Sequence, residues 1–413
     1  MIALEEALDQ RDRWLPPDAG TVPVDAVGER GWHALTDLML PVVVLRETAL
    51  RHNLDLMARF CARHGVSLAP HGKTTMSPPL IARQLAAGAW GVTAASPAQA
   101  RLFRAWGVQT IILANQVVDP VGLGWLAGEL AGHPDARVLC LVDSEAAVAL
   151  VDAALAGRGR PLPVLLEMGL TGGRTGCRTV EDGLRVAAAI RASRSLALAG
   201  VECFEGVVHD LERVDGALRE VRAMAEALGR AGAFDHLEEV LVTAGGSAYF
   251  DRVVHHLVGG WELGRPVRVV LRSGCYLTHD SGDYERLSPF GGRLPEWEPL
   301  RQALEVWGVV HSRPEPDLAI IGFGKRDVSY DVALPRPFRV RGRDGAEHDA
   351  AGMEVFRLND QHAYVRLPAG ADLRVGDLLG CGLAHPCTVF DKWRSMPVVD
   401  DDGRVVGAVK TYF

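Results

Sequence analysis

The sequence has no long uninterrupted apolar run: among its 413 residues we find no stretch of about 18 apolar side chains, the length that spans a bilayer. It also has no block of like charge, because its acids and bases are interspersed and the net charge is only −8. Nucleic acid is therefore not an expected partner. The first residues, Met1–Glu6, are acidic where a signal peptide would be basic. We expect a cytoplasmic protein with no membrane contact.

Cysteine is also scarce, with seven residues in an odd number and without a tight spacing pattern. Such a set does not describe a disulfide framework. Cys61, Cys140 and Cys203 lie within apolar runs, so we expect them to be small core residues. Cys387, which lies near the C-terminus, has different surroundings.

The composition is that of an ordinary globular protein, with 48% hydrophobic and 23% charged residues. A chain of 413 residues is too long for an average single domain. One α/β barrel of about 200–250 residues followed by a smaller domain accounts for this length.

The middle of the chain alternates short apolar runs with helical patterns, which is typical of repeated βα units around a parallel sheet. Eight such runs predict an α/β fold with a (β/α)₈ TIM-type barrel, and a doubly wound open sheet is the less economical alternative. The runs are Val66–Ala69, Trp90–Ala94, Thr110–Ala114, Arg137–Val142, Pro163–Met168, Leu196–Cys203, Glu239–Ala244 and Val267–Arg272.

After Tyr284 proline and glycine become frequent and helical periodicity is lost. We therefore expect an arm at 1–40, a barrel at 41–290 and a mostly β domain at 291–413, with the arm packing on the β domain. The run Pro41–Leu45 precedes the barrel and is an alternative candidate for the sheet of the β domain. The expected strands of that domain are Leu304–His311, Leu318–Gly322, Gly352–Leu358, His362–Leu367, Pro397–Asp400 and Val405–Phe413, with a tight turn at Asp402-Gly403.

Barrel enzymes carry their chemistry in the loops that follow the strands. Lys73, in Pro70-His71-Gly72-Lys73-Thr74, follows the first strand. Gly245-Gly246-Ser247 and Ser273-Gly274 follow the seventh and eighth strands, where barrels commonly hold a phosphate on backbone N–H groups. A phosphate site together with a lysine suggests pyridoxal 5′-phosphate, whose aldehyde forms a Schiff base with a lysine; a plain surface lysine is the alternative.

Arg174 is then a candidate partner for the pyridine nitrogen of the cofactor. A permanent guanidinium charge would keep that nitrogen unprotonated and would weaken the ring as an electron sink. A second electrophile would therefore be useful. His385-Pro386-Cys387 supplies a candidate, because imidazole and thiolate two residues apart in an extended segment would project to one side and suit Zn²⁺. His-x-Cys by itself is an unspecific signal.

Together these segments, with Glu167–Gly176 and Ser273-Gly274-Cys275-Tyr276, resemble the D-serine dehydratase and D-threonine aldolase family, which has the alanine-racemase-type fold of pyridoxal-phosphate enzymes. The similarity begins near residue 35, runs to the end of the chain, and lies closest to a bacterial branch loosely called amino acid deaminases. It implies a barrel followed by a β domain, a head-to-tail homodimer, and a divalent metal, Zn²⁺ or alternatively Mn²⁺ or Mg²⁺, beside the cofactor.

The resemblance also implies roles for single residues. Lys73 would be the Schiff-base lysine and Arg174 the arginine near the pyridine ring, and His385 and Cys387 would be the metal pair. Dehydratases of the family have Cys at the second metal position, where the threonine aldolases usually have Asp, so Cys387 favours elimination. The matching phosphate-binding residues are Gly245, Gly246, Ser247, Gly274 and Tyr276.

One departure from the family concerns Phe204, which stands where relatives often have a tyrosine. The hydrogen bond from that hydroxyl is either absent here or supplied by another residue. We expect a lyase that converts D-serine or a related 3-hydroxy-D-amino acid to a 2-oxo acid and ammonia. The alternatives are retro-aldol cleavage to glycine and an aldehyde, racemisation with Tyr330 or Tyr364 as a second base, and a non-catalytic cofactor-binding protein.

Overall fold

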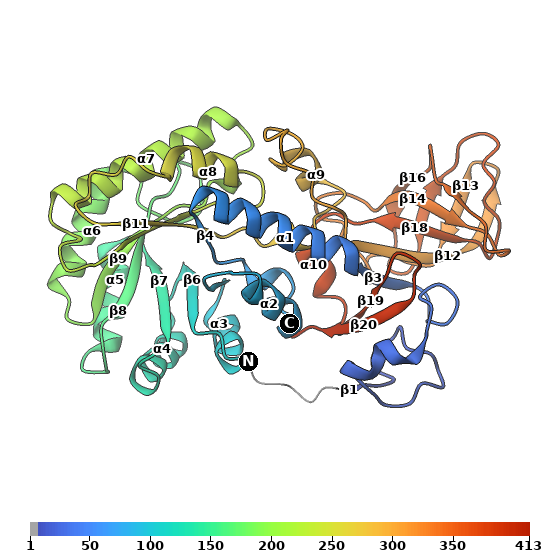
Figure 1. The fold of residues 1–413 in the computed structure, drawn as a ribbon, viewed down its shortest axis with the longest axis horizontal. Coiled ribbons are helices and arrows are strands. Elements are labelled where there is room, and N and C mark those ends of the chain that lie inside the picture. The colour runs from blue at the N-terminus through green and yellow to red at the C-terminus, as the bar shows by residue number, and fades with distance from the viewer. Residues whose placement is uncertain (1–6) are drawn as a thin grey trace. The chain divides into compact units, whose positions relative to one another are not determined.

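The computed structural model describes residues 7–413, so Met1–Glu6 lie outside the described residues. The chain forms two compact units (Figure 1). The barrel unit consists mainly of Met57–Lys73 and Gln84–Gly274. The sheet unit consists of the residues up to Leu56, Thr74–Arg83 and Cys275–Phe413. Each unit is therefore assembled from separate segments, and neither boundary coincides with residue 40 or 290.

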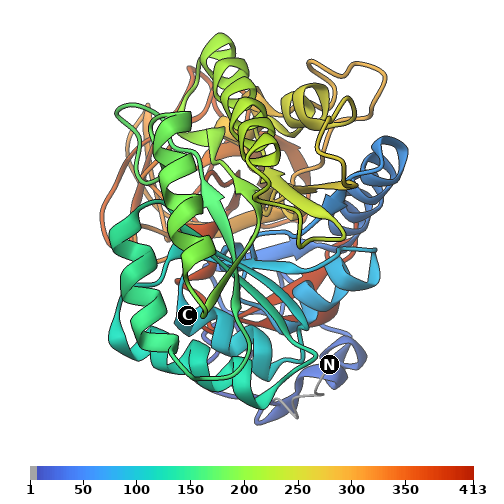
Figure 2. The same cartoon turned by 90° about the vertical axis from the view of Figure 1, so that its left-hand side faces the viewer.

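The barrel unit contains eight parallel strands, each at one of the eight predicted apolar runs. Figure 2 shows the strands of this unit with helices around them. Their order is β4-β11-β10-β9-β8-β7-β6-β5, as expected for a barrel whose strands are added in sequence. The α/β class and the TIM-type barrel are confirmed. The strands are β4 (Ser67–Leu68), β5 (Val92–Ala94), β6 (Thr110–Gln116), β7 (Arg137–Val142), β8 (Leu162–Glu167), β9 (Leu196–Glu202), β10 (Val240–Ala244) and β11 (Val267–Leu271).

The barrel nearly closes between its first and second strands. The N–H of Trp90 donates to the carbonyl of Leu68 at 2.7 Å, and the N–H of Thr93 donates to the carbonyl of Pro70 at 2.9 Å. Its interior is packed with apolar side chains that come from alternate positions of the strands, the arrangement that fills TIM barrels. This buried cluster consists of Ala69, Ile112, Leu139, Leu141, Leu165, Ala199, Leu241 and Val270.

Five helices of the barrel unit begin at side chains that cap their free N–H groups. Ser96 caps α3, Asp119 caps α4, Ser144 caps α5, Thr179 caps α6 and Asp210 caps α7. These caps fix the first turn of the five helices, whereas α8 begins without a side-chain cap. The helices are α3 (Pro97–Ala105), α4 (Pro120–Gly132), α5 (Glu145–Leu155), α6 (Val180–Ala192), α7 (Leu211–Arg230) and α8 (Phe250–Leu257).

Two further helices contain the points at which the chain passes between the units. These are α1 (Glu47–His64) and α2 (Pro78–Ala86). Gly65 ends α1 at φ +63°, a left-handed conformation that glycine adopts without strain. Cys61, Cys140 and Cys203 are buried as expected, and burial raises the pKa of all three thiols.

The sheet unit is built mainly from antiparallel strands, which confirms the predicted β domain. Strand β3 (Val42–Arg46) pairs with β12 and β19, so the run at Pro41–Leu45 belongs to this sheet, the alternative stated above. The other strands are β12 (Leu304–Glu315), β13 (Leu318–Ile321), β14 (Arg336–Arg341), β15 (Glu347–Asp349), β16 (Glu354–Leu358), β17 (Ala363–Arg366), β18 (Leu378–Gly382), β19 (Ser395–Val399) and β20 (Val405–Lys410).

Sequence patterns missed β14, β15 and β18 for identifiable reasons. Strand β14 contains Pro337, which lies at a register shift in its pairing with β18 and cannot donate to a ladder. Strand β15 is entirely polar and exposed. Strand β18 contains two glycines, which have low strand propensity.

The N-terminal arm packs on the sheet unit. The indole N–H of Trp14 donates to Ser395 Oγ at 2.8 Å, and Arg13 pairs with the buried Asp327 at 2.7 Å. The short strands β1 (Ala7–Leu8) and β2 (Val22–Pro23) pair with each other within this arm.

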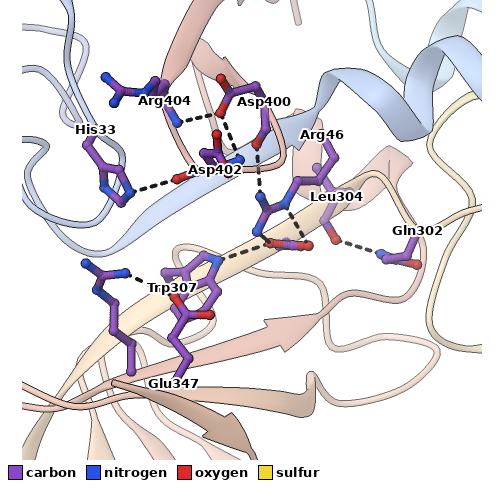
Figure 3. Close-up of polar contacts among 11 residues, drawn as sticks. His33, Arg46, Gln302, Leu304, Trp307, Glu347, Asp400, Asp402 and Arg404 are labelled. Atoms are coloured by element: carbon purple, nitrogen blue, oxygen red, sulfur yellow. Dashed lines mark hydrogen bonds and ion pairs between the residues drawn. The ribbon is translucent and has the colours of Figure 1, made fainter. Parts of the chain in front are cut away.

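A polar network joins β3 and β12 to the hairpin between β19 and β20 (Figure 3). Arg46 donates to Glu305 at 3.0 Å and to the carbonyl of Asp400 at 3.1 Å. Trp307 donates to the second oxygen of Glu305 at 3.1 Å. Gly403 has φ +81°, which confirms the predicted turn at Asp402-Gly403. Within residues 7–413, no helix combines the length and apolar character needed to cross a bilayer.

Candidate functional site

Lys73 lies at the mouth of the barrel unit, in the 3₁₀ turn Gly72–Thr74 that follows β4. A side chain at Gly72 would approach the Phe103 ring within 2.5 Å, so glycine is required for the chain to pass at this point. Lys73 is half-buried, and in the part of the chain that the structure describes its amine has no hydrogen bond or ion pair. An unpaired, partly desolvated amine of this kind suits a Schiff-base lysine.

His71 lies two residues before Lys73, beside Thr93 of β5. Burial lowers the pKa of His71, and the charges of Lys73, Arg272 and Arg174 lower it further. The imidazole is therefore neutral near pH 7. Its Nδ1 atom is buried and lacks a hydrogen-bond partner among the described residues. This atom is available to a bound polar group.

A buried carboxylate organises the loop that contains Arg174. Glu167, at the end of β8, accepts hydrogen bonds from Gln116 at 2.5 Å and from Thr175 at 2.8 Å. Arg178 anchors the same loop through the carbonyls of Thr175 and Gly176. Arg174 itself is exposed, and its guanidinium lies 4.7 Å from the centre of the Phe204 ring. Its assignment to the pyridine nitrogen stays a prediction.

Sequence reasoning missed a second arginine at the barrel mouth. Arg272 directly follows β11, is 4% exposed, and its guanidinium closely contacts the carboxyl group of Glu202 at the end of β9. It also donates to Thr243 Oγ1 at 2.9 Å. Burial raises the pKa of Glu202 to about 8 despite the charge of Arg272. The sequence did contain a signal for this residue, because Arg272 is the charged residue that ends the apolar run Val267–Arg272. Arg272 lies within the predicted strand, and the pattern therefore did not indicate it as a site residue.

The glycine loop after β10 has an unexpected partner. The N–H groups of Gly245 and Gly246 donate to the carboxylate of Glu205, at 3.0 and 2.8 Å. Gly245 adopts φ +98°, a conformation that other residues rarely adopt. Ser247 is buried, and no described residue accepts from its N–H or bonds to its hydroxyl. Of the predicted phosphate loop, Ser247 therefore remains available for an anion.

The second predicted cluster lies in the sheet unit, around the short helix α10 (Cys387–Phe390). Cys387 Sγ lies 3.9 Å from Cys275 Sγ and 3.5 Å from Thr74 Oγ1. His385 also hydrogen-bonds to Cys387. The structure thus brings the two predicted metal ligands together.

The reason for their proximity differs from the prediction. His385 has φ +45° and Cys387 begins a helix, so the segment is a turn and the expectation of an extended strand was wrong. Asp280 accepts from the backbone N–H of His385 at 3.3 Å, and Ser329 donates to the carbonyl of Ala384. These bonds hold the left-handed residue in place, since a positive φ is uncommon outside glycine.

The side chain of His385 is oriented by Asp331. Its Nδ1 atom lies 2.5 Å from one carboxylate oxygen of Asp331, and Thr388 donates to the other at 3.1 Å. The hydrogen bond to Cys387, together with the one to Asp331, raises the pKa of His385 to about 9. Hydrogen bonds from Cys275 and His385 lower the pKa of Cys387, whereas the pKa of Cys275 is raised. Cys387 is thus the thiolate of the pair.

These residues fit a divalent metal. A thiolate and an imidazole that converge on each other are suitable Zn²⁺ ligands, and a carboxylate behind the imidazole is the usual orienting partner. Among residues 7–413, no group of three or more His, Cys, Asp and Glu could hold a metal ion. A metal on this pair would therefore need further ligands from water or substrate.

The barrel-unit residues fit pyridoxal phosphate. Lys73 offers an unpaired amine, and Ser247 offers a hydroxyl and an N–H. Buried polar atoms without partners in the described chain occur on His71, Gln116 and Glu202, each at or just beyond the end of a barrel strand. Gly274 ends this unit, whereas Tyr276 lies in the sheet unit and is buried there. The phosphate-binding assignments stay predictions.

Comparison with known proteins identifies relatives along most of the chain. Residues 45–258 match the alanine racemase N-terminal domain, and residues 303–399 match the putative serine dehydratase domain. The chain is 30% identical to a D-threonine aldolase of Arthrobacter sp. over 378 residues, which cover 87% of this chain and 89% of the relative.

Solved structures show the same fold. The D-threonine aldolase from Filomicrobium marinum superimposes with a TM-score of 0.77 at 24% identity, covering 91% of this chain and 96% of that chain. The D-threo-3-hydroxyaspartate dehydratase from Delftia sp. HT23 gives a TM-score of 0.73 at 23% identity, covering 92% and 99%. A cysteine-to-alanine variant of a D-threo-3-hydroxyaspartate dehydratase has been described in a metal-free form.

Proposed function

Because this chain belongs to the alanine racemase N-terminal domain family and to the lyases related to D-threonine aldolase, we propose that it is a pyridoxal-phosphate-dependent dehydratase. Its substrate would be D-serine or a related 3-hydroxy-D-amino acid, and its products a 2-oxo acid and ammonia. The observation that carries this proposal is the position of Cys387 beside His385: its Sγ lies 3.9 Å from Cys275 Sγ, and Asp331 holds the imidazole of His385 from behind. A metal held by this pair suits departure of a β-hydroxyl.

The cofactor would be bound covalently by Lys73, with its phosphate near Ser247. When bound, pyridoxal phosphate acidifies the α-proton of the amino acid by delocalising the electrons that the proton leaves behind. The divalent metal would lie on His385 and Cys387 and would supply Lewis acidity for the β-hydroxyl. We propose Zn²⁺ from the nitrogen and sulfur donors, with Mn²⁺ or Mg²⁺ as alternatives.

The residues of the chain have separate tasks in this proposal. The amine of Lys73, which would hold the cofactor before substrate binds, would remove the α-proton of the bound amino acid. The neutral ring of His71 adds no further positive charge beside that amine. Asp331 holds one ring nitrogen of His385 and so leaves the other for the metal. Cys275 donates to Cys387 and keeps its sulfur in the thiolate form.

A second candidate reaction is retro-aldol cleavage of a 3-hydroxy-D-amino acid to glycine and an aldehyde. The 30% identity to a D-threonine aldolase favours it. Elimination and retro-aldol cleavage differ in the fate of the β-hydroxyl group. In elimination the hydroxyl group leaves the substrate, whereas in cleavage it loses only its proton. Cys387 supports elimination, because the resemblance described above associates cysteine with dehydratases and aspartate with threonine aldolases.

Product analysis with D-threonine separates these reactions. The enzyme, loaded with pyridoxal phosphate and metal, is incubated with D-threonine, and 2-oxobutanoate, ammonia, glycine and acetaldehyde are all measured. Elimination predicts 2-oxobutanoate and ammonia in equal amounts. Glycine and acetaldehyde as the main products would refute it. D-Serine and 3-hydroxy-D-aspartate then define the preferred side chain, and Cys387→Asp should move the product ratio toward glycine.

We also propose that the protein is a homodimer. This follows from the resemblance, whose members place their active sites at a subunit interface. Light scattering coupled to gel filtration should give twice the 44.5 kDa of one chain, and a mass of one chain would contradict it.

A further inference from the structure

Glu205 lies three residues beyond the end of the sixth barrel strand, β9, and has no exposed surface. It begins the 3₁₀ turn Glu205–Val207, and its two carboxylate oxygens accept from consecutive N–H groups, those of Gly245 and Gly246. Pairs of glycine N–H groups at this position of a barrel commonly receive an anion. In this chain the anion is a side chain of the protein itself.

The opposite side of the glycine loop is also held by the protein. The hydroxyl of Ser273 lies 3.1 Å from the carbonyl oxygens of both Gly245 and Gly246. The N–H of Arg272 donates to the carbonyl of Gly245 at 3.1 Å. A side chain at Gly246 would lie 3.2 Å from the Phe204 ring. The two glycine peptides are therefore fixed on both sides, and their N–H groups are directed at Glu205.

An external phosphate would have to compete with Glu205 for these N–H groups, and two anions sharing the same donors repel each other. The next residue is free of this competition, because Ser247 has an N–H and a hydroxyl without partners in the described chain. Glu205 thus leaves Ser247 as the donor pair of this loop.

We propose that Glu205 is a positioning residue for the cofactor: it holds the Gly245-Gly246 loop so that the phosphate is received by Ser247 instead of by the two glycine N–H groups. This inference rests on the proposed function, since it requires pyridoxal phosphate as the ligand. It assigns Glu205 no contact with the reacting atoms.

The variant Glu205→Gln keeps the shape of the side chain but replaces one acceptor oxygen by an NH₂ group, which faces a glycine N–H. The loop then loses one of its two hydrogen bonds, and Ser247 is no longer held in register. We expect the affinity for pyridoxal phosphate to fall about 10–100-fold. Pyridoxal, which has the same aldehyde and ring but no phosphate, should bind Glu205→Gln and wild type equally.

The experiment measures the ratio of the two affinities. Cofactor is removed from the purified full-length holoenzyme with hydroxylamine, and the protein is titrated with each aldehyde while imine absorbance is followed. The matched control is Asp152→Asn: the carboxylate of Asp152 likewise accepts a backbone N–H, that of Ser195 at 3.2 Å, in the loop before β9. This control should leave the ratio unchanged, and Ser247→Ala should lower it as Glu205→Gln does.

Each outcome has a defined meaning. A ratio lowered in Glu205→Gln and Ser247→Ala, with no further loss in the double variant, supports the proposal because the two residues then act through one contact. Equal loss of both aldehydes in Glu205→Gln indicates a purely structural role and overturns it, as does tighter binding of pyridoxal phosphate. If Glu205→Gln does not fold, an unchanged ratio in Ser247→Ala overturns the proposal. If wild type forms no imine with either aldehyde, the proposed function itself has failed.

Discussion

The carboxylate behind His385 offers a direct test of the metal site. In Asp331→Asn the group that lies 2.5 Å from His385 Nδ1 becomes a neutral amide, which no longer attracts the proton on that nitrogen. The hydrogen bond from Thr388 to the other oxygen can persist, because the amide keeps one oxygen. The substitution therefore removes the charge with little change in shape.

The magnitude follows from the exposure of the pair. Removing a carboxylate that orients a metal-bound histidine typically weakens metal binding about 10–100-fold. The side chains of His385 and Asp331 are 31% and 45% exposed, so solvent screens their charges. We therefore expect the lower end of the range, a loss of about tenfold, which corresponds to about 1.4 kcal/mol.

The assay is a competition titration. Metal-free protein is prepared with a chelator and titrated with Zn²⁺ against a chromophoric chelator. The control is Asp391→Asn, which removes the exposed carboxylate that pairs with Lys392 at 3.4 Å in the same segment of the chain. Wild type and this control should bind Zn²⁺ equally. The reasoning is refuted if Asp331→Asn binds within twofold of wild type, or if Asp391→Asn loses as much.

Three further predictions concern the other parts of the molecule. Lys73→Ala should abolish imine absorbance and lower kcat by about 10²–10⁴-fold or more, because the imine and the proposed base are both lost. A wild-type absorbance spectrum in this variant would exclude Lys73 as the Schiff-base residue. The pKa of Glu202 is raised to about 8, so the stability that its protonated form contributes is complete below the ordinary pKa of 4.5 and is lost as the pH rises to 8. Glu202→Gln should therefore flatten the pH dependence of the free energy of unfolding, measured in urea between pH 4.5 and 8. An unchanged slope would contradict the buried protonated form. Asn53 is fully buried and makes three hydrogen bonds to the backbone of Leu277 and Arg301. Asn53→Ala should therefore lower the free energy of unfolding by about 3 kcal/mol. A loss below about 1 kcal/mol would show that water replaces those bonds.

The barrel could be predicted from sequence because its strands lie in predominantly apolar runs, which is the property that burial on both faces demands. The run at Arg137–Val142 even coincides with β7. Strands of the sheet unit were less predictable because one face is exposed. The polar strand β15 has no apolar residue to mark it.

The residues of the candidate site also fall into two groups, those that a local sequence pattern could predict and those that it could not. Lys73 and His385-x-Cys387 could be found because each is a local pattern with a chemical meaning. Glu205 and Arg272 could not be assigned, because their roles depend on partners 40 and 70 residues away, Gly245 and Glu202. The order of the apolar runs predicts that these residues lie near the ends of barrel strands. It does not predict which side chain forms a hydrogen bond with which donor.

The segmental make-up of the two units has a consequence for protein engineering. The sheet unit draws on three stretches of the chain, with residues 57–73 and 84–274 of the barrel unit inserted between them. No single cut in the gene yields either unit whole, and a truncated chain ending at residue 290 would carry strand β3 without its partners β12 and β19. Exchanging the sheet unit between relatives therefore requires four coordinated crossovers, after Leu56, Lys73, Arg83 and Gly274. A single crossover anywhere within residues 7–413 leaves the sheet unit as a hybrid of two parents, because that unit contains both ends of the described chain.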